Sequence, residues 1–266
     1  MLRPCGEHRE ISWLAMKVLI TGANRGIGLE FTRQYATAGH QVVATCRDPQ
    51  TAFELLSLRD ALGSIEIIRL DVTNDGHIRH VADLMNDEPL DALINNAVRY
   101  GEASFDLNTL DRVEWLRMFD INCIGPVHLT AALRPALRLS ETPKVACIGS
   151  VKASNARNTL GQLYAYRSSK ASLNSAFCSL AIDLAPDRIS VFILSPGWVD
   201  QGKRNPSELT FEQRLQRARH WKEEFGGFSA RQSLTVAVSK MIAQIERLGP
   251  EDSGGFFDHM GDRLPW

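Results

Sequence analysis

A tyrosine, a lysine and an earlier serine are the side chains of this sequence best suited to chemistry. Tyr166 and Lys170 are four residues apart in a predicted helix, so they share one face of it. The Lys170 ammonium favours a phenolate, and we therefore expect it to lower the pKa of Tyr166 and make the phenol a better proton donor near neutral pH. Ser150 follows an apolar run, from which its hydroxyl could bond a substrate carbonyl oxygen. Each signal alone is weak, because such pairs arise by chance and serines are common in turns.

Asn122 lies inside a long predicted helix, where asparagine is disfavoured. Pro126 follows four residues later, and a proline cannot donate a hydrogen bond to the carbonyl at i−4. The main-chain carbonyl of Asn122 would then be free to hold a water that links Lys170 to bulk solvent in a proton relay. The alternative is an ordinary proline kink with solvent at the gap.

A glycine-rich turn follows the first predicted strand and opens the first predicted helix. Glycines let the backbone approach a pyrophosphate closely, and the helix N-terminus offers the anion free N–H groups and a positive dipole end. The spacing Gly-x-x-x-Gly-x-Gly lacks the Gly-Lys-Ser/Thr ending of a P-loop, so it favours a dinucleotide over a nucleoside triphosphate. The residues expected to bind the cofactor here are Gly22, Asn24, Arg25, Gly26, Ile27 and Gly28.

Two arginines favour NADP(H) over NAD(H). An NAD enzyme usually carries an acidic side chain at the end of the second strand, where this sequence has Cys46 followed by Arg47. Arg47 and Arg25 could converge on a 2′-phosphate with charge-assisted hydrogen bonds. The alternatives are that both arginines are solvated surface residues, or that Asp48 pairs with Arg47.

Polar residues also follow the third and fourth predicted strands. Asp71 and Val72 are suited to the adenine edge of a dinucleotide. Asn95, Asn96 and Ala97 could bind the cofactor ribose or stabilise a turn, and the sequence favours neither.

Short apolar runs alternate with helical stretches along most of the chain. Several runs are apolar almost throughout, as expected when helices cover both faces of a parallel sheet. The alternation predicts a single α/β domain of the Rossmann type with a doubly wound parallel sheet. Strands are expected at 17–20, 41–45, 65–70, 90–95, 144–149, 189–195 and 255–258, and helices at 26–38, 50–61, 75–86, 110–138, 165–184 and 233–247.

Composition limits the classes of function. The formal net charge is −1, so no basic field exists to attract nucleic acid or an anionic membrane. No apolar run approaches the ~20 residues of a membrane helix. The 5 cysteines are widely spaced, odd in number and without a Cys-x-x-Cys pair, which argues against disulfides or a metal site and favours a reducing, cytoplasmic compartment.

Two segments depart from the alternating pattern. Residues 1–15 are charged and lack the apolar stretch of a secretory signal, and we expect a disordered extension before a domain at 16–266. Within 200–230, Thr210 and Gln213 resemble a capping box, and apolar residues follow at near-helical spacing. This insertion is interpreted either as a docked surface helix or as a substrate lid or subunit contact.

These residues, in this order, resemble the short-chain dehydrogenase/reductase family over residues 16–266. The segments 164–170, 196–199 and 253–258 are similar to its sniffer and C-factor-like carbonyl reductase branch. The resemblance implies a seven-stranded sheet, a homodimer or homotetramer, and hydride transfer between a nicotinamide and a carbonyl or alcohol substrate.

The resemblance also implies roles for single residues. Tyr166 would be the general acid, Ser150 would orient the carbonyl, and Lys170 would bind the cofactor ribose. Asn122 would belong to the proton relay. The implied cofactor contacts include Tyr166 and Lys170 themselves and, near the nicotinamide, Pro196, Gly197 and Val199.

The sequence departs from the family at two places beside the expected cofactor. Val98 stands where the family usually has glycine after Asn-Asn-Ala, and Gln201 stands where it usually has a threonine that helps to hold the nicotinamide. These departures and the 200–230 insertion motivate a second hypothesis, that the chain is a dinucleotide-binding signalling or scaffold protein with little catalysis.

Overall fold

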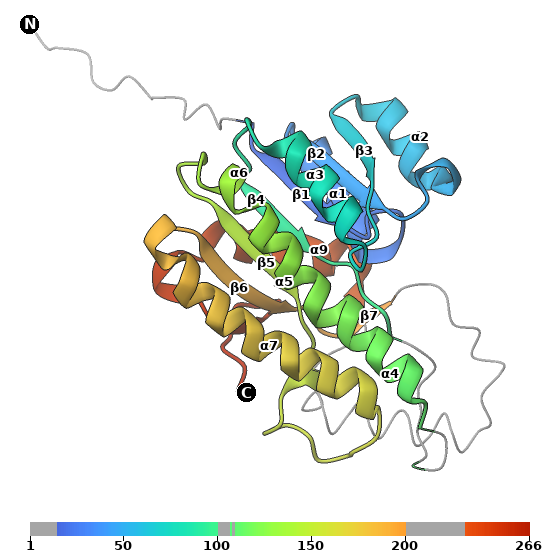
Figure 1. The fold of residues 1–266 in the computed structure, drawn as a ribbon, viewed down its shortest axis with the longest axis vertical. Coiled ribbons are helices and arrows are strands. Elements are labelled where there is room, and N and C mark those ends of the chain that lie inside the picture. Colours follow the sequence, from blue (N-terminus) through green and yellow to red (C-terminus); the bar gives the residue numbers. More distant parts are fainter. Residues whose placement is uncertain (1–14, 101–106, 108–109, 201–231) are drawn as a thin grey trace, which may run out of the picture.

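The computed structural model describes residues 15–100, 107, 110–200 and 232–266. Its centre is a seven-stranded sheet in the order β3-β2-β1-β4-β5-β6-β9, and all neighbouring strands are parallel (Figure 1). The direction of winding reverses between β1 and β4, which is where doubly wound sheets bind ligands. The strands are β1 (Lys17–Thr21), β2 (Gln41–Cys46), β3 (Ile65–Arg69), β4 (Ala92–Asn95), β5 (Lys144–Ile148), β6 (Ser190–Ser195) and β9 (Phe256–Asp258), with a separate parallel pair of β7 (Val199–Asp200) and β8 (Gln232–Ser233).

Helices cover both faces of the sheet. One face packs against α1 (Gly26–Thr37), α2 (Phe53–Leu62) and α9 (Leu234–Arg247). The other packs against α3 (Asp75–Met85), α5 (Gly125–Ala132) and α7 (Tyr164–Leu184). The doubly wound α/β fold expected from the sequence is therefore confirmed, with its seven parallel strands.

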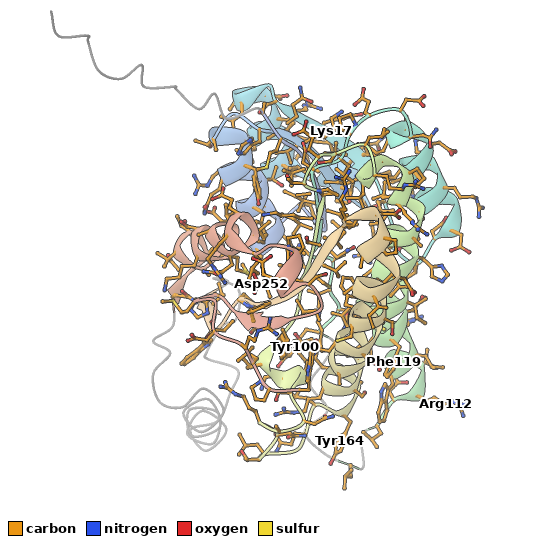
Figure 2. All side chains as sticks on the ribbon, turned by 90° about the vertical axis from the view of Figure 1, so that its left-hand side faces the viewer. Lys17, Tyr100, Arg112, Phe119, Tyr164 and Asp252 are labelled. Carbon is orange, nitrogen blue, oxygen red and sulfur yellow. The ribbon has the colours of Figure 1, made fainter. Side chains whose placement is uncertain are left out.

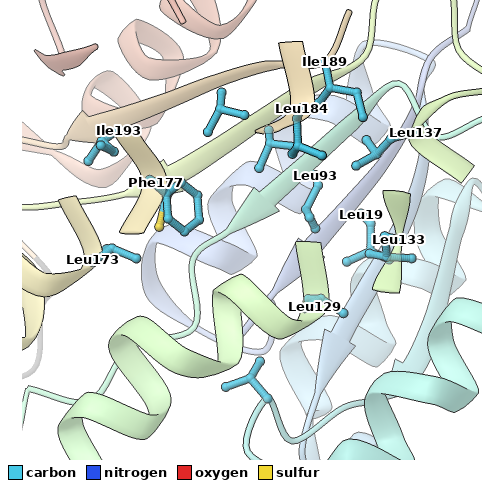
Figure 3. Close-up of a cluster of buried hydrophobic side chains, with 14 of the residues drawn as sticks. Leu19, Leu93, Leu129, Leu133, Leu137, Leu173, Phe177, Leu184, Ile189 and Ile193 are labelled. Atoms are coloured by element: carbon cyan, nitrogen blue, oxygen red, sulfur yellow. The ribbon is translucent and has the colours of Figure 1, made fainter. Parts of the chain in front are cut away.

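The core explains why the central strands are apolar at almost every position. Leu93 of β4 and Ile193 of β6 are fully buried against Leu129 of α5 and Phe177 of α7 (Figure 3). The next residue of β4, Ile94, points to the opposite face and is buried in the cluster beneath α1 and α9. Each such side chain contributes about 1.5–3 kcal/mol relative to exposure, so both helical layers are needed to hold the sheet.

Most predicted boundaries lie within a few residues of the observed ones. The fourth strand begins at Ala92 rather than at residue 90, because the Leu90 N–H donates to the Ala136 carbonyl (3.1 Å) instead of joining the ladder. The sequence did not predict β7, β8 or the short 3₁₀ turns. These turns are η1 (Pro49–Thr51), η4 (Val151–Ala153), η5 (Ala185–Asp187) and η7 (Pro250–Asp252).

The expectation of one continuous helix over 110–138 was wrong. The segment contains α4 (Arg112–Phe119), a π-helical turn η3 (Asp120–Ile124), α5 and the short α6 (Arg134–Leu137). At the end of the π turn, the Gly125 N–H donates to the Asp120 carbonyl. Pro126 lies directly after this turn, and the wider winding accommodates a residue that has no N–H and whose ring crowds the preceding turn.

Two predicted segments lie outside the described residues. They are the N-terminal extension, described only from residue 15, and the amphipathic helix expected within 200–230. Among the helices of the described ranges, none combines the length and the apolarity required to cross a membrane.

Candidate active site

Ser150 and Tyr166 meet at the carboxyl edge of the sheet. Ser150 directly follows β5, and its Oγ accepts the Lys152 N–H (3.2 Å), which starts the η4 turn. Tyr166 lies in the first turn of α7, is 8% exposed, and its phenol is hydrogen-bonded to Ser150. Figure 2 shows Tyr164, the first residue of α7, at the opposite end of the molecule from Lys17, where β1 begins.

The pKa of Tyr166 moves in the direction opposite to the expected one. Burial raises it far above 10, and the nearby phenol of Tyr100 adds to the rise, while the hydrogen bond with Ser150 lowers it. Lys170 is not among the groups that lower the pKa of Tyr166, and burial lowers the pKa of Lys170 itself. In the protein without ligand, Tyr166 is therefore firmly protonated.

Lys170 is held by the main chain of the sheet. Its Nζ donates to the Ile148 carbonyl at 2.8 Å, and the side chain is 2% exposed. An ammonium has three donors, so this contact fixes the group and leaves donors for a ligand. Burial raises the pKa of the nearby Cys147 thiol to about 12 and also raises that of Cys123, so both thiols are neutral near pH 7.

The side chain of Asn122 ties three segments together from within the π turn. Its Oδ1 accepts the Arg99 N–H (2.8 Å), and its Nδ2 donates to the Arg99 carbonyl (2.8 Å) and to Ser169 Oγ (3.0 Å). Ser169 precedes Lys170 and in turn donates to the Tyr166 carbonyl (2.9 Å). Because these contacts occupy the amide, any part that Asn122 takes in proton transfer falls to its main-chain carbonyl.

Tyr100 is a site residue that the sequence reasoning missed. Its ring lies against the Tyr166 ring, with centroids 4.5 Å apart and planes tilted by 50°. The segment before it is fixed by Asn122 and by a two-pronged ion pair of Arg99 with Glu114 on α4 (2.5 and 2.8 Å). The only sequence signal was an aromatic residue soon after the Asn-Asn-Ala segment.

A strained turn leads into α7. Leu163 has a φ of 53° and Gln162 a φ of 60°, a region that side chains other than glycine rarely occupy. The Leu163 side chain is nevertheless buried and packs with Tyr166 and Met118. Such strain persists where the surroundings over-determine the backbone, and here it sets the first turn of α7.

The glycine-rich turn is fastened to the end of β4. Thr21 Oγ1 accepts the N–H groups of Asn96 and Ala97, both at 2.9 Å. Asn96 Nδ2 donates to the carbonyls of Thr21 (2.8 Å) and Gly22 (3.2 Å). Of the two roles left open for Asn96, its contacts are those of turn stabilisation.

Two glycines of this turn have no room for a side chain. Gly22 has a φ of +65°, and a Cβ at Gly28 would lie 2.3 Å from the Gly22 carbonyl oxygen and 2.5 Å from Asn96 Nδ2. Gly26 also has a positive φ, of 55°. The turn is thus formed by close backbone packing and is fastened by the Asn96 amide and the Thr21 hydroxyl.

The N-terminus of α1 is suited to a phosphate group. Its N-cap residue Arg25 is extended, makes no side-chain cap, and the first turn carries no acidic residue. Asn24, Arg25 and Arg47 are exposed, whereas Ile27 is half-buried. Neither Arg25 nor Arg47 has an ion pair with any residue in the described ranges, so Asp48 does not neutralise Arg47 there.

The residues expected at the adenine and ribose have local partners. Asp71 Oδ1 accepts from the N–H and the hydroxyl of Thr73 (3.0 and 2.8 Å), and Val72 is buried beside Gly125. Asn95 Nδ2 donates to Thr130 Oγ1 (3.2 Å), while the buried Asn95 Oδ1 has no partner within the described part of the chain.

The turn after β6 is the last predicted part of the site. Gly197 has a φ of +71°, and Val199 begins β7, which pairs with β8 at Gln232. Gln232 Nε2 donates to the Pro196 carbonyl at 3.0 Å. Of the two departures noted in the sequence, Val98 is 48% exposed beside Ala97, and Gln201 lies outside the described ranges.

The chain resembles known proteins over most of its length. A family model described as short chain dehydrogenase matches residues 16–210. The C-signal protein of Myxococcus xanthus is 36% identical over 178 residues, which are 67% of this chain and 93% of that protein. The solved structure of the carbonyl reductase Sniffer of D. melanogaster is 28% identical, with a TM-score of 0.79 over 95% of this chain and 100% of that one.

A second solved structure, of NADPH-bound carbonyl reductase from chicken fatty liver, is also 28% identical, with a TM-score of 0.78 over 95% of this chain and 99% of that one. The family match covers well over half of the chain, and these neighbours have the same fold. The protein therefore belongs to the short-chain dehydrogenase family, within which it is similar to sniffer-type carbonyl reductases and to C-signal.

Proposed function

We propose that the protein is an NADPH-dependent oxidoreductase that transfers hydride between the nicotinamide and a carbonyl or alcohol substrate. The observation that carries the proposal is the meeting of Ser150 with the protonated phenol of Tyr166, one helical turn from the buried Lys170. A buried acid with a positioned donor beside it is what protonation of a developing alkoxide requires. When bound, the nicotinamide supplies or accepts the hydride.

Each residue of this group has a distinct role in the proposal. Tyr166 holds the proton at its phenol oxygen and gives it to the substrate oxygen during reduction. Ser150 orients that oxygen through the same hydroxyl that bonds the phenol. Lys170, held by the Ile148 carbonyl through one ammonium donor, places its other donors at the ribose. Asn122 bonds the Arg99 backbone and the Ser169 hydroxyl, and so helps to position the first turn of α7 with Tyr166 and Lys170.

The residues present fit the cofactor. The N-terminus of α1 has no capping side chain, the neighbouring turn has glycines at two positive-φ positions, and Arg25 and Arg47 are exposed beside it. Their charge supports NADP(H) over NAD(H), because two guanidiniums can hold a 2′-phosphate. The chicken carbonyl reductase, whose structure contains NADPH, supports the same choice.

Titration of the purified protein with NADPH and NADH, followed by nicotinamide fluorescence, tests the proposal without a known substrate. We expect tighter binding of NADPH, and then turnover with a panel of aldehydes and ketones. Tighter binding of NADH would contradict the assignment of Arg25 and Arg47. Binding of neither would contradict the oxidoreductase itself.

A second candidate function rests on the similarity to C-signal, which is 36% identical over two thirds of this chain. In this hypothesis the protein binds a dinucleotide but acts through a partner, and catalysis is dispensable. A Tyr166→Phe chain returned to cells that lack the protein separates the two. Restored cellular function would favour signalling, and its loss with a stable variant would favour catalysis.

We further propose that the protein forms a homodimer or homotetramer. Val113 and Leu116 of α4 and Ile124 of the π turn are 59%, 60% and 45% exposed. Exposed apolar side chains that recur within one short segment are more typical of an interface than of a free surface. Light scattering during gel filtration should give at least twice the monomer mass, and a Leu116→Glu variant should reduce it.

A further inference from the structure

The turn that leaves β6 is packed against two polar side chains from distant parts of the chain. A Cβ at Gly197 would lie 2.8 and 2.9 Å from the His259 ring and 3.0 Å from Gln232 Nε2. Gln232 belongs to β8, and His259 follows β9. Glycine is required at this position by its φ of +71° and by the closeness of both side chains.

Gln232 holds the turn by its main chain and its side chain. Its N–H donates to the Trp198 carbonyl and its Nε2 to the Pro196 carbonyl, both at 3.0 Å. The two acceptors flank Gly197, so one residue fixes both sides of the turn. Gln232 also pairs with Val199, so the residue that holds the turn belongs to the β7–β8 ladder that follows it.

The same corner contains two buried polar atoms, Gln232 Oε1 and His259 Nδ1, that have no hydrogen-bond partner among the residues the structure describes. Burial lowers the pKa of His259, so its imidazole is neutral in the folded protein near pH 7. Unpaired buried polar atoms cost about 1–3 kcal/mol each, and apolar side chains of similar shape would be more stable. Stability therefore does not explain why glutamine and histidine, rather than apolar residues, occupy these two positions.

We propose that Gln232 and His259 are positioning residues that fix the Pro196–Gly197 turn and thereby set the place of the nicotinamide end of NADP(H). This inference rests on the proposed function. The turn follows β6 at the carboxyl edge of the sheet, the edge on which Ser150 and Tyr166 also meet. A turn at this edge that is pinned from two sides presents its backbone groups in a defined direction, which a flexible turn would not do.

Binding of whole and truncated cofactor tests the proposal. Adenosine 2′,5′-bisphosphate carries the phosphate and adenine end of NADPH but no nicotinamide. We expect Gln232→Met, which keeps the size of the side chain and removes its donor, to raise the Kd for NADPH about 10-fold. The Kd for the bisphosphate should stay within about twofold. Gln41→Met, at the exposed first position of β2 and so at the opposite edge of the sheet, is the matched control and should change neither.

His259→Phe keeps a ring and removes the unpaired nitrogen. It should raise the thermal midpoint while weakening NADPH and sparing the bisphosphate, since it removes a polar cost and changes the packing on Gly197. Equal loss of both ligands in both variants would indicate a merely structural role, and unchanged NADPH binding would also overturn the proposal. If the wild-type protein bound the bisphosphate but not NADPH, the proposed function would fail instead.

A measurement on the wild-type protein does not depend on the folding of any variant. Hydrogen exchange of the main-chain amides in 197–199 should slow with NADPH and stay unchanged with the bisphosphate. Equal protection by both ligands, or by neither, would contradict the placing of the nicotinamide at this turn.

Discussion

At the β1–β2 end of the candidate site, Arg25 and Arg47 are exposed, and the turn beside them is held by the Asn96 amide and the Thr21 hydroxyl. At the β5–α7 end, Tyr166 and Lys170 are buried, and each is bonded to a neighbouring segment. The first end thus offers charge to solvent, whereas the second keeps its polar groups from water and shifts their pKa values toward the neutral forms.

The difference in burial between the two ends corresponds to two tasks, binding a phosphate and donating a proton. A phosphate carries its own charge, so an exposed guanidinium needs only to be near it. A proton donor must be held in the correct state and at the correct distance before the ligand arrives, which requires burial and fixed partners. Substitutions at the first end should therefore weaken NADPH binding, and substitutions at the second end should lower turnover.

The largest effect is expected at Tyr166. Tyr166→Phe should lower turnover by about 10²- to 10⁴-fold, because it removes the proton donor, and should leave the Kd for NADPH within about twofold. Nicotinamide absorbance during carbonyl reduction measures the rate. Tyr164→Phe is the matched control, since Tyr164 shares the first turn of α7, and its rate should be near that of the wild type. Full activity of Tyr166→Phe would contradict the assignment of proton donation to the buried end of the site.

Thr21 joins the glycine turn to β4, and its replacement should affect folding. Thr21→Val keeps the shape and leaves the N–H groups of Asn96 and Ala97 without their acceptor. We expect the free energy of unfolding to fall by about 1–3 kcal/mol, as measured by urea denaturation. Thr37→Val, at an exposed position, should change it by less than about 0.5 kcal/mol. Equal stability of the two variants would mean that the hydroxyl does not hold the turn.

A smaller and more selective effect is expected at Arg47. Arg47→Ala should weaken NADPH about 10-fold and leave NADH nearly unchanged, because only NADPH has a 2′-phosphate. The difference should shrink at high salt, since the guanidinium is exposed. Arg59→Ala on α2, also exposed, is the control and should affect neither cofactor. Loss of both cofactors together would show that Arg47 supports the fold.

The smallest effect concerns pH. The folded pKa of His259 lies below its usual value of 6.5, mainly because of burial. As the pH falls below 6.5, the unfolded chain takes up a proton that the folded chain resists, so stability present above 6.5 is lost on the acid side. The wild type should lose up to about 1.4 kcal/mol per pH unit more than His259→Phe in this window. Denaturation at pH 7, 6 and 5 measures it, and parallel slopes for the two proteins would show that His259 is not protected from protonation.

The sequence was sufficient for the fold because its signals are local. Apolar runs such as 144–149 and 189–195 predicted buried strands, and the order of elements predicted the doubly wound sheet, which the structure has. The motif residues were identified in the same way, by type and by spacing. Their convergence at one edge follows from the common direction of parallel strands.

The remaining features depend on contacts between residues far apart in the chain. Asn96 fastens Gly22 across 74 positions, and Gln232 reaches Pro196 across 36. The expected direction of the Tyr166 pKa shift was wrong because burial is its largest cause, and burial is not visible in a spacing of four residues. The Tyr100 ring was missed for the same reason.

The π turn at Asp120–Ile124 makes this part of the chain intolerant of small deletions. Each residue of an α-helix turns the chain by about 100°. Removing one residue from the turn would force regular α-helical winding at Pro126, whose ring would crowd the carbonyl four residues earlier. It would also rotate α4 by that angle relative to α5, and so separate Asn122 from Arg99 or Glu114 from its arginine. We therefore expect deletion of Ile121 or Cys123 to be more damaging than most substitutions, although neither residue has a role in the proposed chemistry.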